Sequence, residues 1–251
     1  MIGGVYEDLD RPPLRPRALA RALEPDGWRV EVHDRVGSTN AVVAERARAG
    51  EAAGLVVVAE QQTAGRGRLD RAWVSPPRAG LTVSVLLDAA GPWVPLWGGV
   101  AVARALREQA GVDAVLKWPN DVLIGGRKAC GLLAELVDGR VVLGLGLNVT
   151  TRREELPRPD ATSLVLEDAT TTDRDTLLRA VLRCLADVLR EASPDGYRAL
   201  CATIGAPVRV ELPGGAVVEG VAEAVDDDGR LVVGGTAYGV GDVTHVRAGT
   251  A

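Results

Sequence analysis

Several residue types are scarce in this sequence, and each shortage excludes a class of protein. Among 251 residues there is no Phe, and the only cysteines are Cys130, Cys184 and Cys201. An odd number of cysteines without paired spacing predicts neither a disulfide framework nor a zinc site, so a reducing cytoplasm is the expected location. No apolar run is long enough to span a membrane, and residues 1–16 lack the apolar core of a secretory signal, so we expect no membrane partner.

An excess of basic charge is also lacking. The formal net charge is −5 at pH 7, whereas general nucleic-acid binding needs a clustered basic surface. Only about 25 residues precede the first expected strand, and a helix-turn-helix domain needs roughly twice that length. We therefore expect no DNA-binding domain and no DNA partner.

Lys and Asn are rarer than in most proteins. Of 29 basic residues only Lys117 and Lys128 are Lys, and Asn occurs only as Asn40, Asn120 and Asn148. The ordinary cause is genomic base composition, which favours Arg, Ala, Gly and Val where side-chain identity is loose. The remaining Lys and Asn are then expected where Arg or Asp will not serve, because a compact ammonium and a planar guanidinium differ physically.

The residues that are present predict an α+β protein. Helices are expected over 16–24, 41–49, 95–110 and 172–192, and strands over 28–35, 55–59, 81–87, 114–117, 131–137 and 140–149. Further short strands over 208–212, 220–225, 231–233 and 240–246, separated by Gly-rich turns, predict a small SH3-like β-barrel. We expect a loose tail at 1–15, a catalytic domain at 16–204 and a C-terminal domain at 205–251.

Five segments carry candidate site residues. They are Ser38-Thr39-Asn40, the stretch from Gly65-Arg66-Gly67-Arg68 to Trp73 with Ser75-Pro76, Lys117-Trp118-Pro119-Asn120-Asp121, the stretch from Arg127 through Lys128 and Gly131 to Glu135, and Gly144 to Val149. All five Lys and Asn residues lie in these segments, which make up well under a fifth of the chain. This predicts one site assembled from the first 150 residues.

The residue types in these segments suit an anionic ligand. Arg66 and Arg68 can place two guanidinium groups on one phosphate or carboxylate, and the neighbouring glycines let the backbone approach it. Each segment alone has an ordinary alternative. These are a solvated basic loop, a strand-ending turn at Pro119, tight packing at the strand glycines and a plain helix cap at Ser38.

Taken together and in order, the segments resemble the biotin–protein ligase family. Ser-Thr-Asn, Gln-Thr-x-Gly-Arg-Gly-Arg, Trp-x-Ser-Pro, Lys-Trp-Pro-Asn-Asp, Lys-x-x-Gly-x-Leu-x-Glu and Gly-x-Asn-Val all look like its motifs, from about Ser38 to Ser163. The resemblance is to its monofunctional type. It implies a class II synthetase-like fold, in which helices flank a mixed, largely antiparallel sheet and a small SH3-like barrel follows.

The resemblance also implies an activity. The protein would use ATP and Mg²⁺ to convert biotin into biotinyl-5'-AMP. It would then transfer biotin to a specific lysine of a carrier domain in a biotin-dependent carboxylase. The sequence assigns no metal ligands.

Roles for single residues follow from the same resemblance. Ser38, Thr39 and Gln62 would hydrogen-bond the ureido ring of biotin, and Asn40 would support them while capping its helix. The rest of the biotin site would comprise Gly65, Arg66, Gly67, Arg68, Lys128 and Gly131. Of these, Arg66, Arg68 and Lys128 would be catalytic, with Lys128 bridging the biotin carboxylate and the α-phosphate. The nucleotide would contact Arg66, Arg68, Trp73, Lys117, Asn120, Asp121, Lys128 and Asn148.

The chain departs from the family pattern at two places. Ala129-Cys130 replaces the more usual Leu-Ala after Lys128, and Arg78 stands where the family often has Gly. Neither change removes a charged group. Three other readings remain: a lipoate or octanoate transferase, a biotin-sensing transcriptional regulator, and a non-catalytic ligand-binding module. The Gly-Arg-Gly-Arg loop and the C-terminal strands favour biotin.

Overall fold

The computed structural model describes residues 11–68, 71–88, 91–239 and 241–246. Residues 1–10 of the expected tail and residue 240 of the last expected strand lie outside the described residues. Residues 11–15 lead into helix α2 (Pro16–Leu23) with the side chain of Leu14 buried. Within the described residues, no helix combines the length and the apolar character that crossing a bilayer requires.

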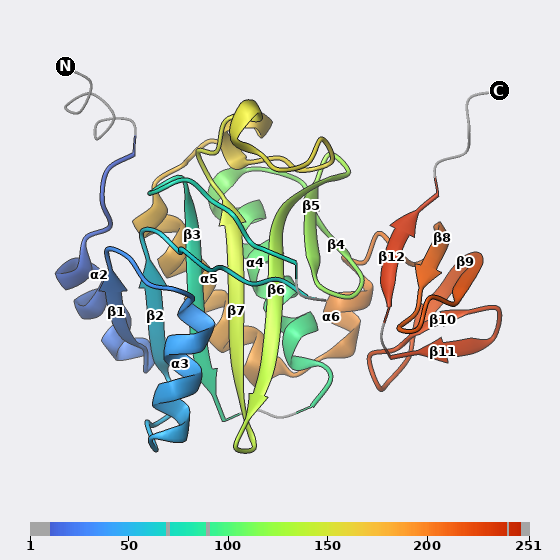
Figure 1. Ribbon diagram of the computed structural model, residues 1–251, viewed down its shortest axis with the longest axis horizontal. Helices are drawn as coiled ribbons and strands as arrows, with labels where there is room; N and C mark the ends of the chain where they lie inside the picture. Colours follow the sequence, from blue (N-terminus) through green and yellow to red (C-terminus); the bar gives the residue numbers. More distant parts are fainter. Residues whose placement is uncertain (1–10, 69–70, 89–90, 240, 247–251) are drawn as a thin grey trace.

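A seven-stranded sheet forms the centre of the molecule (Figure 1). Its strands, in spatial order, are β1 (Arg29–His33), β2 (Leu55–Ala59), β3 (Gly80–Leu87), β7 (Arg140–Asn148), β6 (Arg127–Val137), β5 (Asp121–Ile124) and β4 (Ala114–Lys117). Only β1 and β2 pair in parallel, and every other neighbouring pair is antiparallel. The predicted mixed, largely antiparallel sheet is confirmed.

Helices cover the two faces of this sheet unequally. Figure 1 shows α3 (Thr39–Arg48) on one face and α4 (Val94–Ala110) and α5 (Arg174–Glu191) on the other. The remaining short helices are α6 (Pro194–Arg198) and the 3₁₀ turns η1 (Glu24–Asp26), η2 (Arg153–Glu155) and η3 (Leu164–Glu167). The apolar residues of α4 and α5 join the main core, as expected for amphipathic helices packed on a sheet.

Alternation along β7 gives the two faces different side chains. Leu143 and Leu145 lie in the core on the face of α4, and a Cβ added to Gly98 of α4 would come within 2.9 Å of Leu143. Gly144 and Gly146 point to the other face, because neighbouring strand residues face opposite ways. That face is left with room for polar and aromatic side chains from distant segments.

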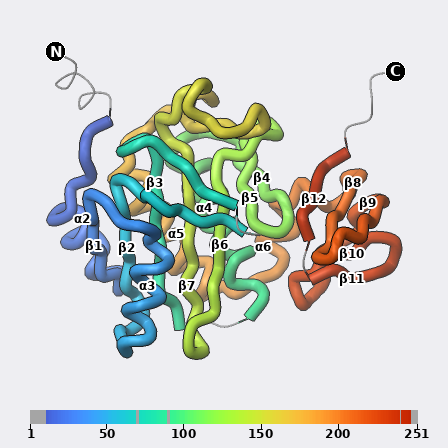
Figure 2. Tube along the Cα trace, viewed as in Figure 1, coloured from blue at the N-terminus to red at the C-terminus, as the bar shows by residue number. Residues whose placement is uncertain are grey.

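A second sheet follows at the C-terminal end of the chain (Figure 2). Its antiparallel strands, in spatial order, are β11 (Thr236–Tyr238), β10 (Leu231–Val233), β9 (Val217–Val225), β8 (Pro207–Glu211) and β12 (Asp242–His245). Two indoles attach it to the larger sheet: Trp93 Nε1 donates to Asp227 O (2.7 Å) and Trp118 Nε1 to Gly229 O (2.9 Å). The predicted all-β module is confirmed as a sheet, while closure into a barrel and the boundary at residue 204 stay predictions.

The strand β5 was missed by the sequence analysis. Pro119 ends β4 as predicted, but the chain reverses there and Asp121 begins β5 rather than standing free at a strand edge. Its four residues lie between Pro119 and Gly125-Gly126, both of which favour a loop over a strand. The strand expected from 131 begins at Arg127, since its first residues pair with β5.

Candidate active site

The residues predicted to bind the biotin ring form one buried polar wall. Ser38, Thr39 and Asn40, at the start of α3, are at most 6% exposed. Gln62 reaches the same place from the segment after β2, and its Oε1 accepts from Thr39 N (2.7 Å) and Thr39 Oγ1 (3.1 Å). Ser84 of β3 lies beneath, with its Oγ 2.7 Å from Thr39 Oγ1 and 2.6 Å from Asn40 Oδ1. The four predicted residues are thus brought together, and hydrogen bonds hold the side chains of Thr39, Asn40 and Gln62.

The predicted role of Asn40 as a helix cap is wrong. The N-cap of α3 is Ser38, whose side chain makes no capping hydrogen bond, and Asn40 lies within the first turn. Its Nδ2 donates instead to Glu135 Oε2 (2.7 Å) and Leu133 O (3.4 Å) on β6. A Cβ added to Gly144 would lie 2.1 Å from Asn40 Oδ1. The missing side chain at Gly144 therefore lets the Asn40 amide pack against the sheet.

Two of the predicted catalytic cations are paired with carboxylates. Arg66 Nη2 donates to Glu135 Oε1 (3.0 Å), and Lys128 Nζ lies 2.6 Å from Asp121 Oδ1. The Arg66 and Lys128 side chains are 51% and 34% exposed, and half-exposed ion pairs of this kind contribute at most about 1 kcal/mol to stability. Asp121 Oδ1 is buried and its contact with Lys128 lacks hydrogen-bond geometry. A ligand anion could therefore take the place of the carboxylate that each cation now contacts.

The third predicted catalytic cation, Arg68, is held by neutral oxygens. It donates to Asn120 Oδ1 (3.1 Å) and to Gly241 O (3.3 Å), and Asn120 Nδ2 in turn donates to Leu132 O (2.8 Å). Burial lowers the pKa of Arg68, against the opposing effect of the Asp242 charge. A half-buried guanidinium whose hydrogen bonds go to uncharged acceptors remains available to an anion.

The C-terminal sheet reaches the same loop through Asp242. Arg71 Nη2 forms an ion pair with this carboxylate. Burial acts to raise the pKa of Asp242, but the hydrogen bond and charge of Arg71, with the charges of Lys117 and Arg68, lower it below its usual value. Lys117, at the end of β4, thus belongs to the same cluster of charges, as predicted for a residue near the site.

Trp73 lies against the glycines of β6 and β7. A Cβ added to Gly146 would come within 2.3 Å of its ring, and one added to Gly131 would come within 3.3 Å. Lys128 Nζ is 5.9 Å from the centroid of the same indole, and Trp73 Nε1 is buried without a hydrogen-bond partner. In Figure 1 the segment after β2 runs across the front of β7 and β6. Gly131 and Gly146 thus form a floor on which a flat ring fits.

Asn148 is joined to Lys128 through the loop that follows β7. Asn148 Nδ2 donates to Thr162 O (2.9 Å), Thr162 N donates to Lys128 O (2.8 Å), and Lys128 N donates to Asp160 O (2.8 Å). Asn148 is 5% exposed. Its amide nitrogen therefore holds this loop, which leaves Oδ1 for any further partner.

The two departures from the family pattern lie in structured positions. Arg78 has a φ of +59°, a left-handed conformation that glycine adopts more readily, which explains why Gly is common there. Cys130 is buried in β6, and burial raises the pKa of its thiol to about 12. The Cys130 thiol is therefore protonated at neutral pH and carries no nucleophilic role.

Two cavities lie near these residues without coinciding with the polar wall. One of about 530 Å³ opens between the two sheets and is lined in part by Arg68 and Asn120. The other, of about 450 Å³, lies beside residues 11–15 and Thr150. Lys128 lines neither of them.

Three residues of the site had no predicted role. Glu135 lies within one of the quoted segments, and its position four residues from Gly131 on β6 could have suggested a carboxylate facing the site. Ser84 gave a weaker signal, as a polar residue inside an apolar strand. Asp242 gave none, because nothing in the sequence pairs it with a loop some 170 residues away.

Known proteins match nearly the whole chain. Residues 32–150 match the "Biotin/lipoate A/B protein ligase family" and residues 203–240 match the "Biotin protein ligase C terminal domain". The chain is 44% identical to the "Biotin--[acetyl-CoA-carboxylase] ligase" of Mycobacterium tuberculosis, over 96% of this chain and 98% of that protein. The chain belongs to the biotin–protein ligase family. As a member of that family it is a ligase, and the resemblance found in the sequence is confirmed.

Solved structures of the family share the fold. The biotin protein ligase of Aquifex aeolicus in complex with biotin and ATP superposes with a TM-score of 0.73 and 26% identity, covering 87% of this chain and 99% of that one. The Leishmania major enzyme in complex with biotinyl-5-AMP gives a TM-score of 0.63 at 26% identity, covering 87% and 98%. The "Bifunctional ligase/repressor BirA" of Bacillus subtilis is 31% identical over 82% of this chain and 70% of its own length.

Proposed function

We propose that this ligase activates biotin with ATP and transfers it to a lysine of a carboxylase carrier domain. One observation carries the proposal. Arg66 and Arg68 of one loop and Lys128 of β6 lie near a buried polar wall, and each is held by an oxygen that a ligand anion can replace. Such a cluster suits a reaction in which one anion attacks another.

In the first step the biotin carboxylate attacks the α-phosphate of ATP and pyrophosphate leaves. The product is the mixed anhydride biotinyl-5'-AMP. Lys128 leaves Asp121 and bridges the carboxylate and the α-phosphate, while Arg66 and Arg68 neutralise the phosphates. A mobile ammonium suits the reacting centre and planar guanidinium groups suit fixed phosphates. Ser38, Thr39 and Gln62 hold the ureido ring, as the wall is hydrogen-bonded and buried.

In the second step the ε-amine of the acceptor lysine attacks the acyl carbon and AMP leaves. The anhydride must survive until the carrier arrives, so water has to be excluded. Trp73 of the Gly-Arg-Gly-Arg loop already lies against the sheet, with Gly65 O accepting from Trp73 N (2.9 Å). Lys117, Asn120 and Asp121 stand where the acceptor amine enters, and Gly67 and Gly131 give the ligand close access. The Mycobacterium tuberculosis relative is named for acetyl-CoA carboxylase, which supports a carboxylase carrier as partner.

Magnesium bound to ATP would lower the charge repulsion between the two anions. Among the described residues no cluster of three His, Cys, Asp or Glu side chains is arranged to hold a metal. This fits Mg²⁺, because water molecules and phosphate oxygens usually supply most of its ligands. Asp121, whose buried Oδ1 makes no hydrogen bond, is the residue that would hold it. The three free cysteines fit a reducing compartment, so we place the reaction in the cytoplasm.

Exchange of radiolabelled pyrophosphate into ATP tests the first step. With biotin and Mg²⁺ present we expect exchange, and with lipoate in place of biotin we expect none. Exchange with lipoate alone would favour lipoate activation, and no exchange with either acid would contradict the proposal. Adding a biotin carboxyl carrier domain and following its mass then tests transfer, with an acceptor Lys→Arg carrier as the control.

A further inference from the structure

The segment that precedes α2 is anchored deep in the protein. Residues 11–15, here called the N-terminal strap, cross the end of the sheet where β2 stops and β3 begins. Leu14 N donates to Glu60 Oε1 (2.7 Å), and Arg174 Nη1 donates to Glu60 Oε2 (2.5 Å). The Glu60 and Arg174 side chains are each 5% exposed. Arg174 Nη2 also donates to Pro12 O (2.6 Å), so the strap is fixed to a buried ion pair.

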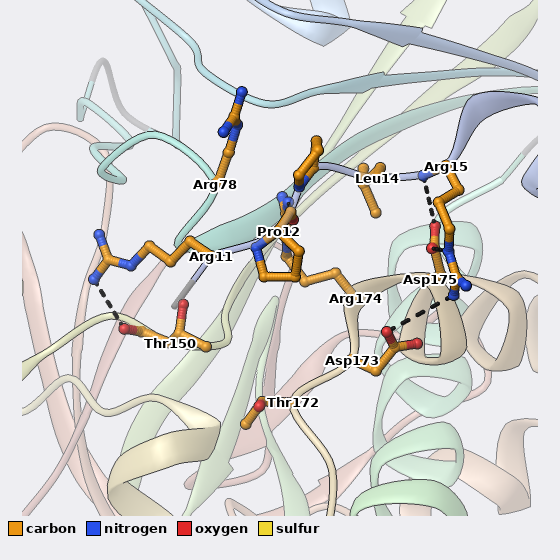
Figure 3. A pocket seen from close by; sticks show the side chains of 11 residues that line it. Arg11, Pro12, Leu14, Arg15, Arg78, Thr150, Thr172, Asp173, Arg174 and Asp175 are labelled. Carbon is orange, nitrogen blue, oxygen red and sulfur yellow. Dashed lines mark hydrogen bonds and ion pairs between the residues drawn. The ribbon is translucent and has the colours of Figure 1, made fainter. Parts of the chain in front are cut away.

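The first described residue of the strap grips the loop that follows β7. Arg11 Nη2 donates to Thr150 O (3.0 Å) and to Glu155 Oε2 (2.5 Å). Glu155 Oε2 also accepts from Arg152 N (2.8 Å), which closes the turn η2. Figure 3 shows the Arg11 side chain extending from the strap to Thr150 beside a cavity of about 450 Å³. Arg11 therefore ties the strap to the loop at two points, Thr150 and Glu155.

The other end of this loop, which follows β7, lies at the candidate site. Asp160 O and Thr162 N bond to the backbone of Lys128, and Asn148 Nδ2 holds Thr162 O. The loop, residues 149–162, is held where it begins by Ala79 O, which accepts from Thr150 N (2.8 Å), and by Arg11. Where it ends it is held by Lys128 and Asn148. A change at its beginning alters the loop that lies between the two residues predicted to contact the nucleotide.

We propose that Arg11 is a positioning residue for ATP binding. It orders the loop of residues 149–162 from a distance and touches no reacting atom. This inference rests on the proposed function, because it takes Asn148 and Lys128 as nucleotide contacts. It predicts that the loss of Arg11 weakens ATP binding and leaves the polar wall of Thr39 and Gln62 unaffected.

Pyrophosphate exchange by Arg11→Ala, with ATP and biotin varied in turn, tests the proposal. We expect the KM for ATP to rise about fivefold, because a partly exposed charged hydrogen bond is worth a factor of roughly three to ten. The KM for biotin should stay within about twofold. Arg11→Lys, which keeps the charge and one donor direction, should restore part of the ATP affinity. Arg17→Ala, at an exposed position of α2, is the matched control and should behave as wild type.

A double-mutant cycle assigns the effect to the Glu155 contact. If Arg11 acts through Glu155, Arg11→Ala combined with Glu155→Ala should be no worse than the more impaired single variant. Fully additive effects on the KM for ATP would overturn that assignment. Equal rises in both KM values, or a lower kcat with both KM values unchanged, would show a merely structural role and overturn the proposal.

Hydrogen exchange supplies a readout that does not depend on activity. In Arg11→Ala the amides of residues 150–156 should exchange faster than in wild type, while those of α3 should not change. Unchanged exchange in the loop would overturn the inference even in a protein that shows no pyrophosphate exchange. A different result separates this inference from the proposed function. If the wild-type protein shows no pyrophosphate exchange but the loop amides of Arg11→Ala exchange hydrogen faster, the proposed function is overturned and the positioning by Arg11 stands.

Discussion

The two sides of the central sheet use charge in different ways. On the side of α5, the Glu60–Arg174 pair is 5% exposed at both ends and ties together the strap, β3 and the start of α5. On the side of α3, the Arg66–Glu135 pair is 51% and 29% exposed. A buried pair is costly to break, whereas an exposed one is cheap to rearrange. The protein thus separates the charges that hold the fold from those that are free to meet a ligand.

Breaking the buried pair should give the largest effect. Glu60→Gln leaves the Arg174 guanidinium without its charged partner in a buried site, and we expect the free energy of unfolding to fall by about 3–5 kcal/mol. Chemical denaturation measures it. Glu135→Gln is the matched control on the other side and should cost less than about 1 kcal/mol. Similar costs for the two substitutions would contradict the comparison.

Lys128→Arg should affect chemistry without affecting the fold. Arg keeps the charge but not the compact, mobile ammonium, so we expect kcat/KM for pyrophosphate exchange to fall about 100-fold. The melting temperature should stay within about 2 °C of wild type, since the Lys128–Asp121 pair is partly exposed. Near-normal kinetics would show that Lys128 does not bridge the two anions.

The glycine floor offers a test within a single strand. A Cβ at Gly146 would overlap the Trp73 ring, so Gly146→Ala should shift the indole and raise the KM for ATP about tenfold, equivalent to 1.4 kcal/mol. Leu145→Met, a volume-conserving change on the α4 side of the same strand, is the control and should leave both KM values unchanged. Equal effects of the two substitutions would mean that the faces do not differ in function.

The smallest expected effect is a pH dependence of stability that comes from His245, close to the hydrogen bond of Trp118 to the second sheet. His245 Nε2 lies 3.0 Å from Thr203 Oγ1, which accepts from Trp118 N (3.0 Å). Burial, and then the charge of Lys117, lower the pKa of His245 below 6.5. The unfolded chain therefore binds a proton first, so this contribution to stability is complete above about pH 6.5 and is lost as the pH falls toward the folded pKa.

Thermal unfolding at pH 7.5 and pH 5.5 measures this contribution. His245→Gln should lose less melting temperature between the two pH values than wild type does. An equal loss in both proteins would show that folding does not lower the pKa of His245.

Some features of the site could be predicted from single segments. The Gly-Arg loop, the scarce Lys and Asn residues and the alternating Gly and Leu of β7 each had a local signal, because they reflect chemistry or periodicity within a few residues. The strand partner of Asn40 had no such signal. Asn40 was read as a cap because Ser-Thr-Asn before a helix usually is one, whereas its amide is bound by a strand some 95 residues further along the chain.

The sequence by itself determined the family motifs, the order of most elements and the set of cations available to a ligand. Only the tertiary structure decided which oxygen each cation meets, that Trp73 rests on Gly131 and Gly146, and that Arg11 and Asp242 reach loops of the site from the two ends of the chain. The physical reason is that periodicity and capping act over a few residues. Ion pairs between distant segments depend instead on how the whole chain packs.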